Sequence, residues 1–531
     1  MIKNFLIFVA VLLASCSANR STKTTQIATS APTDIGVEYG YSSLYGTDSD
    51  GPSANIAVLL PSTGNTKSIG NGIKTSIETA LLRNPKQNIK VSFYDLSGDE
   101  YNRKDVIDTA LNTNPDVIIG PIFAEDVITL RDNKAYKTPV ISFTSDVSAL
   151  GDNVMTINLI PTQSIEVIMQ QMQNDGVKNI IILAPDDKSG QLMASVADRA
   201  SSVYNIPTKG LFYYTPSNSD SIKNAAIRAS MHNARNAANI RAREVLSDIL
   251  TKESLSAQEK YSLRKQLEKI SRTETLGDLP YDAILFLGNG TDSKTLVSFL
   301  RYYGIGNRDA AFYGTTLWND SDIASELTLS GAKYATLPEI SDNFKGLYSM
   351  MSGTDPNYLV AFGYDAANLA LGLLHSYKDT SAYLFDPSGY NGTTGIFRIQ
   401  PNGESERALR ILELNGSGTP TVIANSPQNF LKPIYNVKTS RLYNVPEKEL
   451  VTPGVNPGNY INIPERLRKK SAYKTKTIGA NYEEEEYHEQ TFAPIQIFES
   501  DTNETVSNPE YEPVELESVS RKYIDTVEIN E

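Results

Sequence analysis

Short apolar runs that alternate with stretches of helical periodicity are the feature of this chain that most constrains its fold. Residues 56–60 form a continuous apolar run that stops at Pro61, as buried parallel strands do. A stretch with Ile73, Ile77 and Leu81 on one helical face follows it. Further apolar runs and helix-like stretches then alternate at 89–94, 103–111, 117–120, 125–134 and 140–143. This order predicts βαβ units, and hence a parallel sheet covered by helices on both faces.

The same alternation starts again after Pro161. Strand-like runs at 179–183, 210–214, 283–287 and 311–314 alternate with helix-like stretches at 164–175, 191–204 and 293–302. The sequence therefore predicts an α/β protein with two similar doubly wound lobes. Two such lobes form a cleft between the carboxyl ends of their sheets, which is where small ligands bind in folds of this class.

A helical insertion, residues 221–276, interrupts the second lobe. It is rich in Ala, Arg, Lys, Glu and Leu and contains neither Pro nor Gly. We expect two helices, at about 221–252 and 257–272, the second starting at the capping box formed by Ser256 and Glu259. Two interpretations stay open: a helical hairpin packed on its own lobe, and an arm that docks a partner.

The net charge of −13 is concentrated at the C-terminus. Residues 481–531 contain fifteen acidic residues against Arg521 and Lys522, so the rest of the 531-residue chain is close to neutral. This balance excludes a nucleic-acid partner, which would require a basic surface. Residues 426–531 lose the apolar alternation and are expected to form a disordered, acidic tail. The basic segment 466–476 within it is either a solvated linker or a segment that contacts anionic lipid headgroups or the acidic tail.

The N-terminus has the layout of a secretory signal. Lys3 precedes an apolar run at 5–13, which is shorter than the roughly 20 residues needed to span a bilayer. The following Leu-Ala-Ser-Cys resembles the bacterial lipobox, whose cysteine is lipidated, and Cys16 is the only cysteine. We therefore expect a signal peptide at 1–16 and a membrane anchor on Cys16. Ser17 resembles the outer-membrane sorting pattern, and residues 17–53 are expected to be a flexible tether.

Six segments, in order, resemble the type I periplasmic binding protein family: 55–64, 116–121, 139–146, 281–288, 362–367 and 394–403. The resemblance covers about residues 54–425. It implies a first lobe at about 54–160 and 337–390, and a second lobe at about 161–336 and 391–425. Within the family, residues 120–124, 140–146 and 184–187 look like the LpoA/LppC-type lipoproteins, called penicillin-binding protein activators.

The resemblance also implies candidate residues for a ligand cleft. In the family's amino-acid receptors, hydroxyls and backbone N–H groups after the strands of the first lobe hold the ligand's carboxylate, helped by a helix N-terminus. The residues that match these positions, together with one acidic residue of the second lobe, are Ser62, Thr63, Gly120, Ser142, Thr144, Ser145 and Asp186. The hydroxyls can equally be helix caps. Asp146 would repel a carboxylate, and Lys188-Ser189-Gly190 lacks the aromatic residue that receptors place there.

Catalysis, cofactors and metals are not expected. A single cysteine and three distant histidines, His232, His375 and His488, supply neither a metal site nor a nucleophile–base pair. Three functions stay open. The first is an envelope lipoprotein that regulates a peptidoglycan synthase, a penicillin-binding protein, by contact. The second is a solute receptor of an ABC-type importer for a small amino-acid-like ligand, and the third is a scaffold lipoprotein with a degenerate cleft.

Overall fold

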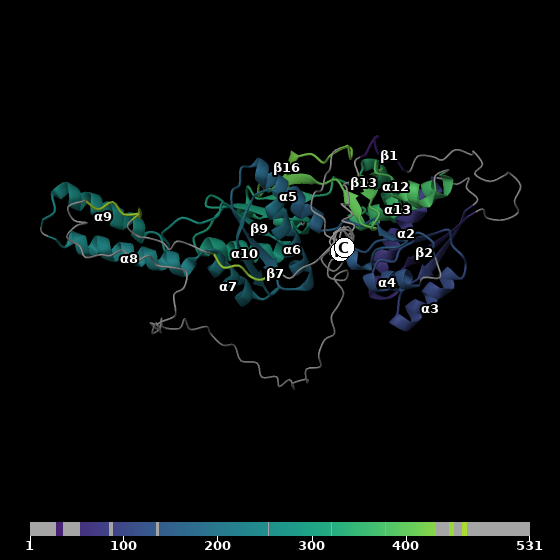
Figure 1. Ribbon diagram of the computed structural model, residues 1–531, viewed down its shortest axis with the longest axis horizontal. Coiled ribbons are helices and arrows are strands. Elements are labelled where there is room, and N and C mark those ends of the chain that lie inside the picture. Colours follow the sequence, from purple (N-terminus) through teal and green to yellow (C-terminus); the bar gives the residue numbers. More distant parts are fainter. Residues whose placement is uncertain are drawn as a thin grey trace, which may run out of the picture.

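Two α/β lobes lie side by side, and a helical hairpin extends from the second lobe away from the first (Figure 1). The computed structural model describes residues 28–35, 54–83, 89–133, 137–252, 254–319, 321–376, 379–431, 445–450 and 459–464. The predicted signal peptide and Cys16 lie outside these residues. In the part of the chain so described, no helix combines the length and the apolar character needed to cross a bilayer.

The first lobe is built on a five-stranded parallel sheet in the order β3-β2-β4-β5-β6. Its strands are β2 (Ala54–Leu60), β3 (Ile89–Asp95), β4 (Val117–Ile119), β5 (Val140–Ser142) and β6 (Val154–Thr156). Its helices are α2 (Lys67–Leu82), α3 (Glu100–Leu111), α4 (Ala124–Asp132), α12 (Asp342–Ser352), α13 (Tyr358–His375) and α14 (Thr380–Leu384).

Alternation along β2 explains why helices cover both faces of this sheet. Ile56 and Val58 pack in one apolar cluster with Ile73 of α2, whereas Ala57 and Leu59 pack in another that contains residues of α3 and α4. Successive side chains of a strand point to opposite faces, so an uninterrupted apolar run needs an apolar partner on each side. The prediction of a doubly wound parallel sheet is confirmed here.

The second lobe contains a seven-stranded sheet in the order β16-β15-β11-β10-β9-β7-β8. Its strands are β7 (Ile180–Pro185), β8 (Thr208–Tyr214), β9 (Ala283–Phe286), β10 (Ala311–Gly314), β11 (Lys333–Thr336), β15 (Arg410–Glu413) and β16 (Thr421–Ala424). β15 pairs antiparallel with β11, and β16 pairs antiparallel with β15. Its helices are α5 (Thr162–Asn174), α6 (Lys188–Val203), α7 (Ser219–Ala229), α10 (Gly290–Tyr302) and α11 (Ser321–Ala324).

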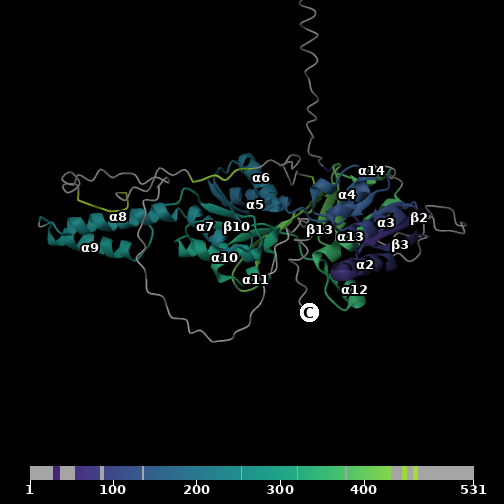
Figure 2. The ribbon, with the colours of Figure 1, turned by 90° about the horizontal axis from the view of Figure 1, so that it is seen from below.

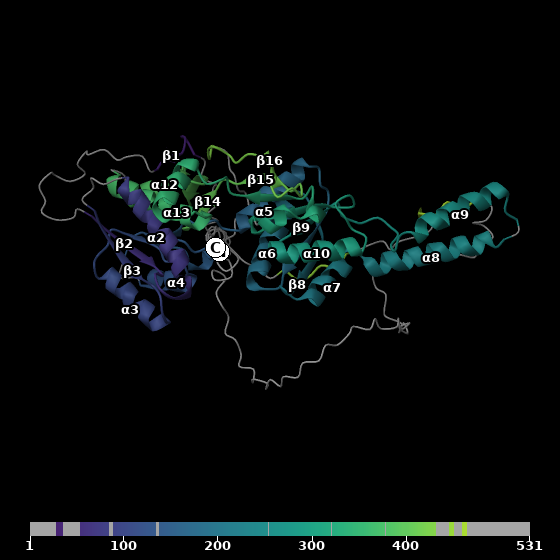
Figure 3. The ribbon, with the colours of Figure 1, turned by 180° about the vertical axis from the view of Figure 1, so that it is seen from behind.

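A third sheet, in the order β1-β12-β13-β14, adjoins the first lobe near the junction of the lobes (Figure 3). Its strands are β1 (Thr33–Asp34), β12 (Tyr390–Gly392), β13 (Gly395–Ile399) and β14 (Ser405–Arg407). Thr156 donates its backbone N–H to Gly403 O (2.9 Å), which joins this sheet to β6. Short 3₁₀ turns at Gly64–Thr66, Val147–Ala149, Thr316–Trp318 and Leu327–Leu329 complete the elements.

The expected lobe boundary at residue 391 is wrong for residues 391–407. Thr393 donates its N–H to the buried carboxylate of Asp365 in α13 (2.8 Å), and Ser405 donates its hydroxyl to Asn158 O. These contacts hold β12–β14 on the first lobe, and the chain enters the second lobe only at β15. The error arose because strands that cover a junction carry the same apolar pattern as strands of either lobe.

The expected tether at 17–53 is wrong for residues 28–35. β1 pairs with β12, and Ala28 donates its N–H to Phe430 O (3.2 Å). Ala28 is buried with Ile396, Ala408 and Phe430. A short polar segment shows no apolar periodicity, so its sequence does not indicate that it pairs with a strand far along the chain.

The expected disordered tail at 426–531 is wrong for its described residues, which are 426–431, 445–450 and 459–464. Phe430 is buried with Ala28, and the other two segments pack on the second lobe and its hairpin. Lys448 and Leu211 of β8 exchange two backbone hydrogen bonds of 2.9 Å, and Arg228 donates to Glu447 at 2.8 Å. Further along, Asn462 donates its N–H to Gln266 Oε1 (2.7 Å) and Ile461 is buried. We call residues 445–450 and 459–464 the C-terminal strap.

The helical insertion consists of three helices. α7 packs on the second lobe, and α8 (His232–Leu250) and α9 (Ala257–Ser271) form the projecting hairpin (Figure 2). The helix expected at 221–252 is broken at Met231, whose φ of 52° is left-handed. Apolar residues of α8 and α9, with Leu246 and Leu263 at their centre, pack against each other and against Ile461 of the strap. The hairpin therefore has its own small core instead of lying on its lobe.

Candidate functional site

Ser62 and Thr63 follow β2 and lie beside Asp95, the last residue of the neighbouring strand β3. Ser62 donates its backbone N–H to Asp95 Oδ1 (2.7 Å), and Thr63 donates its hydroxyl to Oδ2 (3.0 Å). Ser97 adds its own N–H to Oδ1 (3.0 Å). The groups predicted to hold a ligand's carboxylate thus hold a carboxylate of the chain itself.

The Asp95 carboxylate is stabilised in its charged form. Burial by itself raises its pKa, but hydrogen bonds from Ser97, Ser62 and Thr63 outweigh this effect and lower the pKa to about 2. The Ser97 hydroxyl also accepts the N–H of Thr63 (3.0 Å), which closes the loop after β2 onto the loop after β3. At neutral pH, Asp95 is therefore an anion that would repel a second carboxylate at this position.

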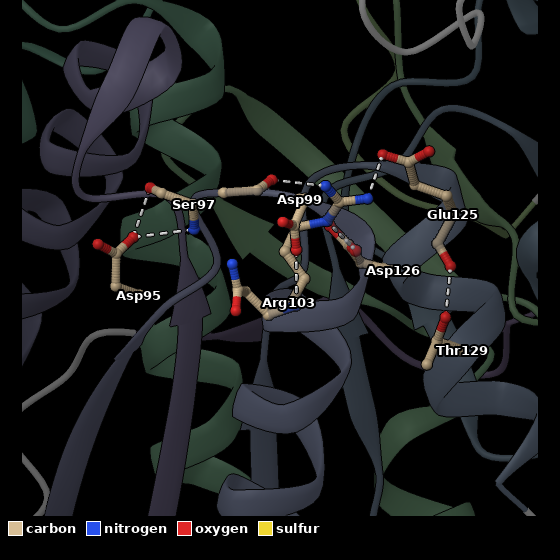
Figure 4. Close-up of polar contacts among 9 residues, drawn as sticks. Asp95, Ser97, Asp99, Arg103, Glu125, Asp126 and Thr129 are labelled. Atoms are coloured by element: carbon tan, nitrogen blue, oxygen red, sulfur yellow. Dashed lines mark hydrogen bonds and ion pairs between the residues drawn. The ribbon is translucent and has the colours of Figure 1, made fainter.

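A second ionic cluster lies next to Asp95, with Arg103 of α3 at its centre (Figure 4). Its Nε donates to Asp126 Oδ1 (2.8 Å), its Nη2 to Glu125 Oε1 (2.9 Å) and its Nη1 to Gly98 O (2.8 Å). Burial alone lowers the pKa of Arg103, but the carboxylates, Asp126 first, raise it above its usual value. The cluster fastens the start of α4 to α3 and has a structural role.

The remaining first-lobe candidates are mostly engaged in backbone contacts. Gly120 is buried and donates its N–H to Ile141 O (2.8 Å). Ser142 is fully buried and donates its hydroxyl to Met155 O (2.8 Å), and the buried Thr144 hydroxyl accepts the N–H of Asp146 (3.1 Å). Ser145 is half-buried. Ser142 and Thr144 therefore support the backbone between β5 and β6, and their role in ligand contact stays a prediction without direct support.

In the second lobe, Asp186 follows β7 and is exposed. Its Oδ2 accepts the hydroxyl of Thr215 (2.7 Å), while the adjacent Asp187 caps α6 by accepting the N–H of Gly190 (2.8 Å). A helix cap of this kind is the ordinary use of an Asp at a helix start. Asp186 is thus paired within its own lobe, like the first-lobe hydroxyls.

A search of the described residues for a metal site gives a negative result. These residues contain no group of three or more His, Cys, Asp and Glu side chains able to hold a metal ion. Asp95 and Arg103 were absent from the sequence-based candidates. An Asp directly after the strand-like stretch 89–94, with Ser two residues later, was the available signal for Asp95, because this spacing lets Asp bind the following backbone.

Replacing Asp95 with asparagine tests the internal carboxylate. We expect a loss of about 1 kcal/mol of unfolding free energy at pH 7, because the partly exposed charge is screened by solvent. The folded pKa lies below the usual value of 3.8, so this stability is present above about pH 4 and is lost as the pH falls toward 2. Urea unfolding across this pH range would show the two proteins converging, with Asp105→Asn as an exposed control. A constant difference down to pH 2 would contradict the assignment.

Comparison with known proteins gives a match for part of the chain. Residues 48–203 match the model of the family described as LppC putative lipoprotein. The penicillin-binding protein activator LpoA of Mannheimia succiniciproducens is 26% identical over 144 residues, which are 26% of this chain and 24% of that protein. The chain thus spans about a quarter of the length of this curated relative. The resemblance to LpoA/LppC-type lipoproteins is confirmed over this region.

Two solved structures share the fold. A putative branched-chain amino acid ABC transporter protein from Rhodospirillum rubrum has a TM-score of 0.52 at 16% identity, covering 70% of this chain and 99% of that chain. A branched-chain amino acid ABC transporter periplasmic ligand-binding protein from Burkholderia xenovorans has a TM-score of 0.50 at 15% identity, covering 72% and 97%. The predicted type I periplasmic binding protein fold is confirmed. At these identities the likeness concerns the fold alone.

Proposed function

We propose that this protein is a cell-envelope lipoprotein that regulates a peptidoglycan synthase, a penicillin-binding protein, through direct contact and without catalysis of its own. The observation that carries the proposal is the match of residues 48–203 to the LppC lipoprotein family, together with the LpoA relative. The lipid anchor is assigned to Cys16, and the outer membrane is the proposed location.

The geometry around Asp95 supports contact regulation over solute transport. An amino-acid receptor needs unoccupied donors for the carboxylate of its ligand. Here Ser62 and Thr63 already donate to Asp95. A charge-assisted hydrogen bond from within the chain competes with the same bond to a ligand, and the ligand must also overcome repulsion by Asp95.

The projecting hairpin is the proposed contact surface. α9 presents Arg264, Lys265 and Lys269 to solvent. The strap holds the base of the hairpin, where Tyr460 and Asp278 share a hydrogen bond of 3.1 Å. A helical arm with its own core and an exposed basic face can meet an acidic protein surface without rearranging either lobe.

A capture experiment tests the function. The full-length protein, immobilised in detergent, is incubated with envelope extract of the same bacterium, and captured penicillin-binding proteins are identified with a fluorescent penicillin. We expect one labelled synthase to be retained, and its rate of peptidoglycan synthesis to rise when the purified proteins are mixed. The triple change Arg264→Glu, Lys265→Glu and Lys269→Glu should reduce retention at least about tenfold, as loss of rim charges slows association.

The control is a matched reversal of three exposed basic residues on the lobes, Lys104→Glu, Arg301→Glu and Arg308→Glu. It makes the same change in net charge and should leave retention unchanged. A thermal-shift series with leucine-like amino acids is run beside it, since a bound ligand raises the melting temperature by mass action. A clear shift with no labelled synthase retained would replace the proposal with the transport-receptor function.

A further inference from the structure

A basic stripe lies on the exposed side of α9 in the projecting hairpin. Its members are exposed and lie on the side of the helix opposite the buried Leu263 and Ile270. They are Arg264, Lys265, Lys269 and, at the C-cap, Arg272. Glu268 is the one acidic residue in the sequence from 261 to 272, and it is paired with Arg272. Four basic residues against one acidic residue leave the stripe with a net charge of +3.

The C-terminal strap runs along the flank of α9 toward the start of this helix (Figure 1). Tyr460 donates its hydroxyl to Asp278 Oδ2 (3.1 Å), beyond the end of α9. Two residues later, Asn462 and Gln266 of α9 exchange hydrogen bonds of 2.7 and 3.2 Å. Gln266 directly follows Lys265 in the sequence. The chain therefore leaves the described residues, at residue 464, beside the basic stripe.

The sequence beyond this point carries an acidic run within reach of the stripe. Residues 483–486 are four consecutive glutamates, and the first of them follows residue 464 by nineteen residues. A chain spans at most about 3.5 Å per residue, so this connection can extend to about 65 Å. α9 has fifteen residues and is therefore about 22 Å long. The acidic run can reach every part of the stripe.

The acidic run and the basic stripe match in length and in charge. Four extended residues span about 13 Å, and Arg264 and Arg272 are about 12 Å apart along the helix axis. Four negative charges then meet a net charge of +3. A single exposed ion pair contributes little, but several pairs within one chain form at a high effective concentration, because the connection keeps the two partners close.

Residues 466–476 offer the acidic run an alternative partner, since they carry six basic residues. The stripe has an advantage that follows from its structure. Its side chains project from a helix that is packed in the core of the hairpin, so pairing there orders only the acidic run. Pairing with residues 466–476 is the alternative that an experiment has to separate.

We propose that the acidic run at 483–486 docks on the basic stripe of α9 in the same molecule. The docked run covers Arg264, Lys265 and Lys269, which are the residues proposed to contact the synthase. It therefore inhibits that contact until an acidic surface of the partner displaces it. The docking is argued from the hairpin and the strap alone, whereas the inhibition rests on the proposed function.

Carbodiimide cross-linking of the full-length protein in detergent tests the docking, because the reagent joins a lysine amine only to a carboxylate in contact with it. We expect amide links from Lys265 or Lys269 to residues 483–486, at least about tenfold more abundant than links from the exposed Lys104. In a mixture with ¹⁵N-labelled protein, the links should join peptides of the same label. Raising NaCl from about 0.05 M to about 0.5 M should reduce their yield at least about threefold, because salt screens exposed charges.

Two variants of equal charge change locate the contact. Arg264→Gln with Arg272→Gln alters two exposed residues, keeps every reacting amine and carboxylate, and should reduce the links at least about threefold. The control, Arg301→Gln with Arg308→Gln, alters two exposed residues of the second lobe and should leave the links unchanged. The proposal is overturned by an absence of links from α9, by links between differently labelled copies, by equal yields in the two variants, or by links confined to the lysines of residues 466–476.

The capture experiment tests the inhibition. Replacing all four glutamates at 483–486 with glutamine should raise the amount of retained synthase at least about threefold. The same replacement at Glu510, Glu512, Glu515 and Glu517 makes an equal charge change and should leave retention unchanged. Equal retention by both variants would overturn the inhibition. Intramolecular links without any captured synthase would uphold the docking and overturn the proposed function.

Discussion

Replacing Arg407 with methionine is expected to lower the free energy of unfolding by about 3–5 kcal/mol, the cost of removing one partner from a buried ionic network. Arg407 is fully buried in β14. Its Nε and Nη2 both donate to Ile157 O, at 3.0 and 2.5 Å, and its Nη1 donates to Thr394 Oγ1 (3.0 Å). The guanidinium carbon lies 4.0 Å from the ring centroid of Phe362. Methionine fills much of the space but leaves these acceptors unpaired.

The charge of Arg407 also acts on Asp365. Burial raises the pKa of Asp365 to about 6, and Arg407 is the main influence that opposes a further rise. Replacing Arg407 therefore leaves the buried carboxylate of Asp365 without its main opposing positive charge. A double-mutant cycle with Asp365→Asn should recover part of the loss, because the two side chains belong to one network.

Chemical unfolding followed by circular dichroism would measure the effect. Arg410→Met is the matched control, because Arg410 donates to Leu337 O at 3.1 Å and to Glu339 Oε1 at 3.4 Å but is less deeply buried. Its loss should be about 1–2 kcal/mol. A loss for Arg407→Met no larger than that of the control would show that the network contributes little.

Gly120→Ala is expected to destabilise the first lobe by about 4 kcal/mol or more, since two separate penalties combine. Gly120 has a φ of +95°, which residues with a Cβ rarely adopt. Its added Cβ would lie 2.2 Å from Leu59 O, a backbone atom of the interior strand β2 that cannot move without shifting the sheet. The role of Gly120 is thus to let two strand ends approach closely.

Gly64→Ala separates the two penalties. Gly64 also has a positive φ, +69°, but a Cβ there would meet no atom within 4 Å. Gly64→Ala should lower the free energy of unfolding only by the cost of the backbone strain, about 1–2 kcal/mol. Melting temperatures of both variants, measured by calorimetry, give the comparison. Equal losses would mean that the contact with Leu59 is relieved by a small local shift.

The parallel sheets were predictable because buried strands leave a direct record in the sequence. Residues 56–60 and 180–183 are apolar at every position, so both faces of these strands must be covered, here by helices on each side of the sheet. The loops after the strands were also correctly placed as polar. Their partners were not predictable, since the contact of Ser62 with Asp95 depends on β3 being the neighbour of β2.

Elements that depend on distant partners were missed for the same reason. Residues 28–35 and the strap have too few apolar side chains to form structure alone, and they are ordered by pairing with β12, β8 and α9. Asp365 entered the sequence analysis only within the family-like segment 362–367.

If Cys16 carries the proposed lipid, the attachment of residues 28–35 to the first lobe limits how far that lobe can stand from the membrane. Ala28, the first residue held on the first lobe, follows Cys16 by twelve residues. A fully extended chain spans at most about 3.5 Å per residue, so the segment between Cys16 and Ala28 can span at most about 40 Å. The first lobe would be held near the membrane surface. The hairpin belongs to the second lobe. Its distance from the membrane would then depend on how the two lobes are oriented about the attachment point of the first lobe.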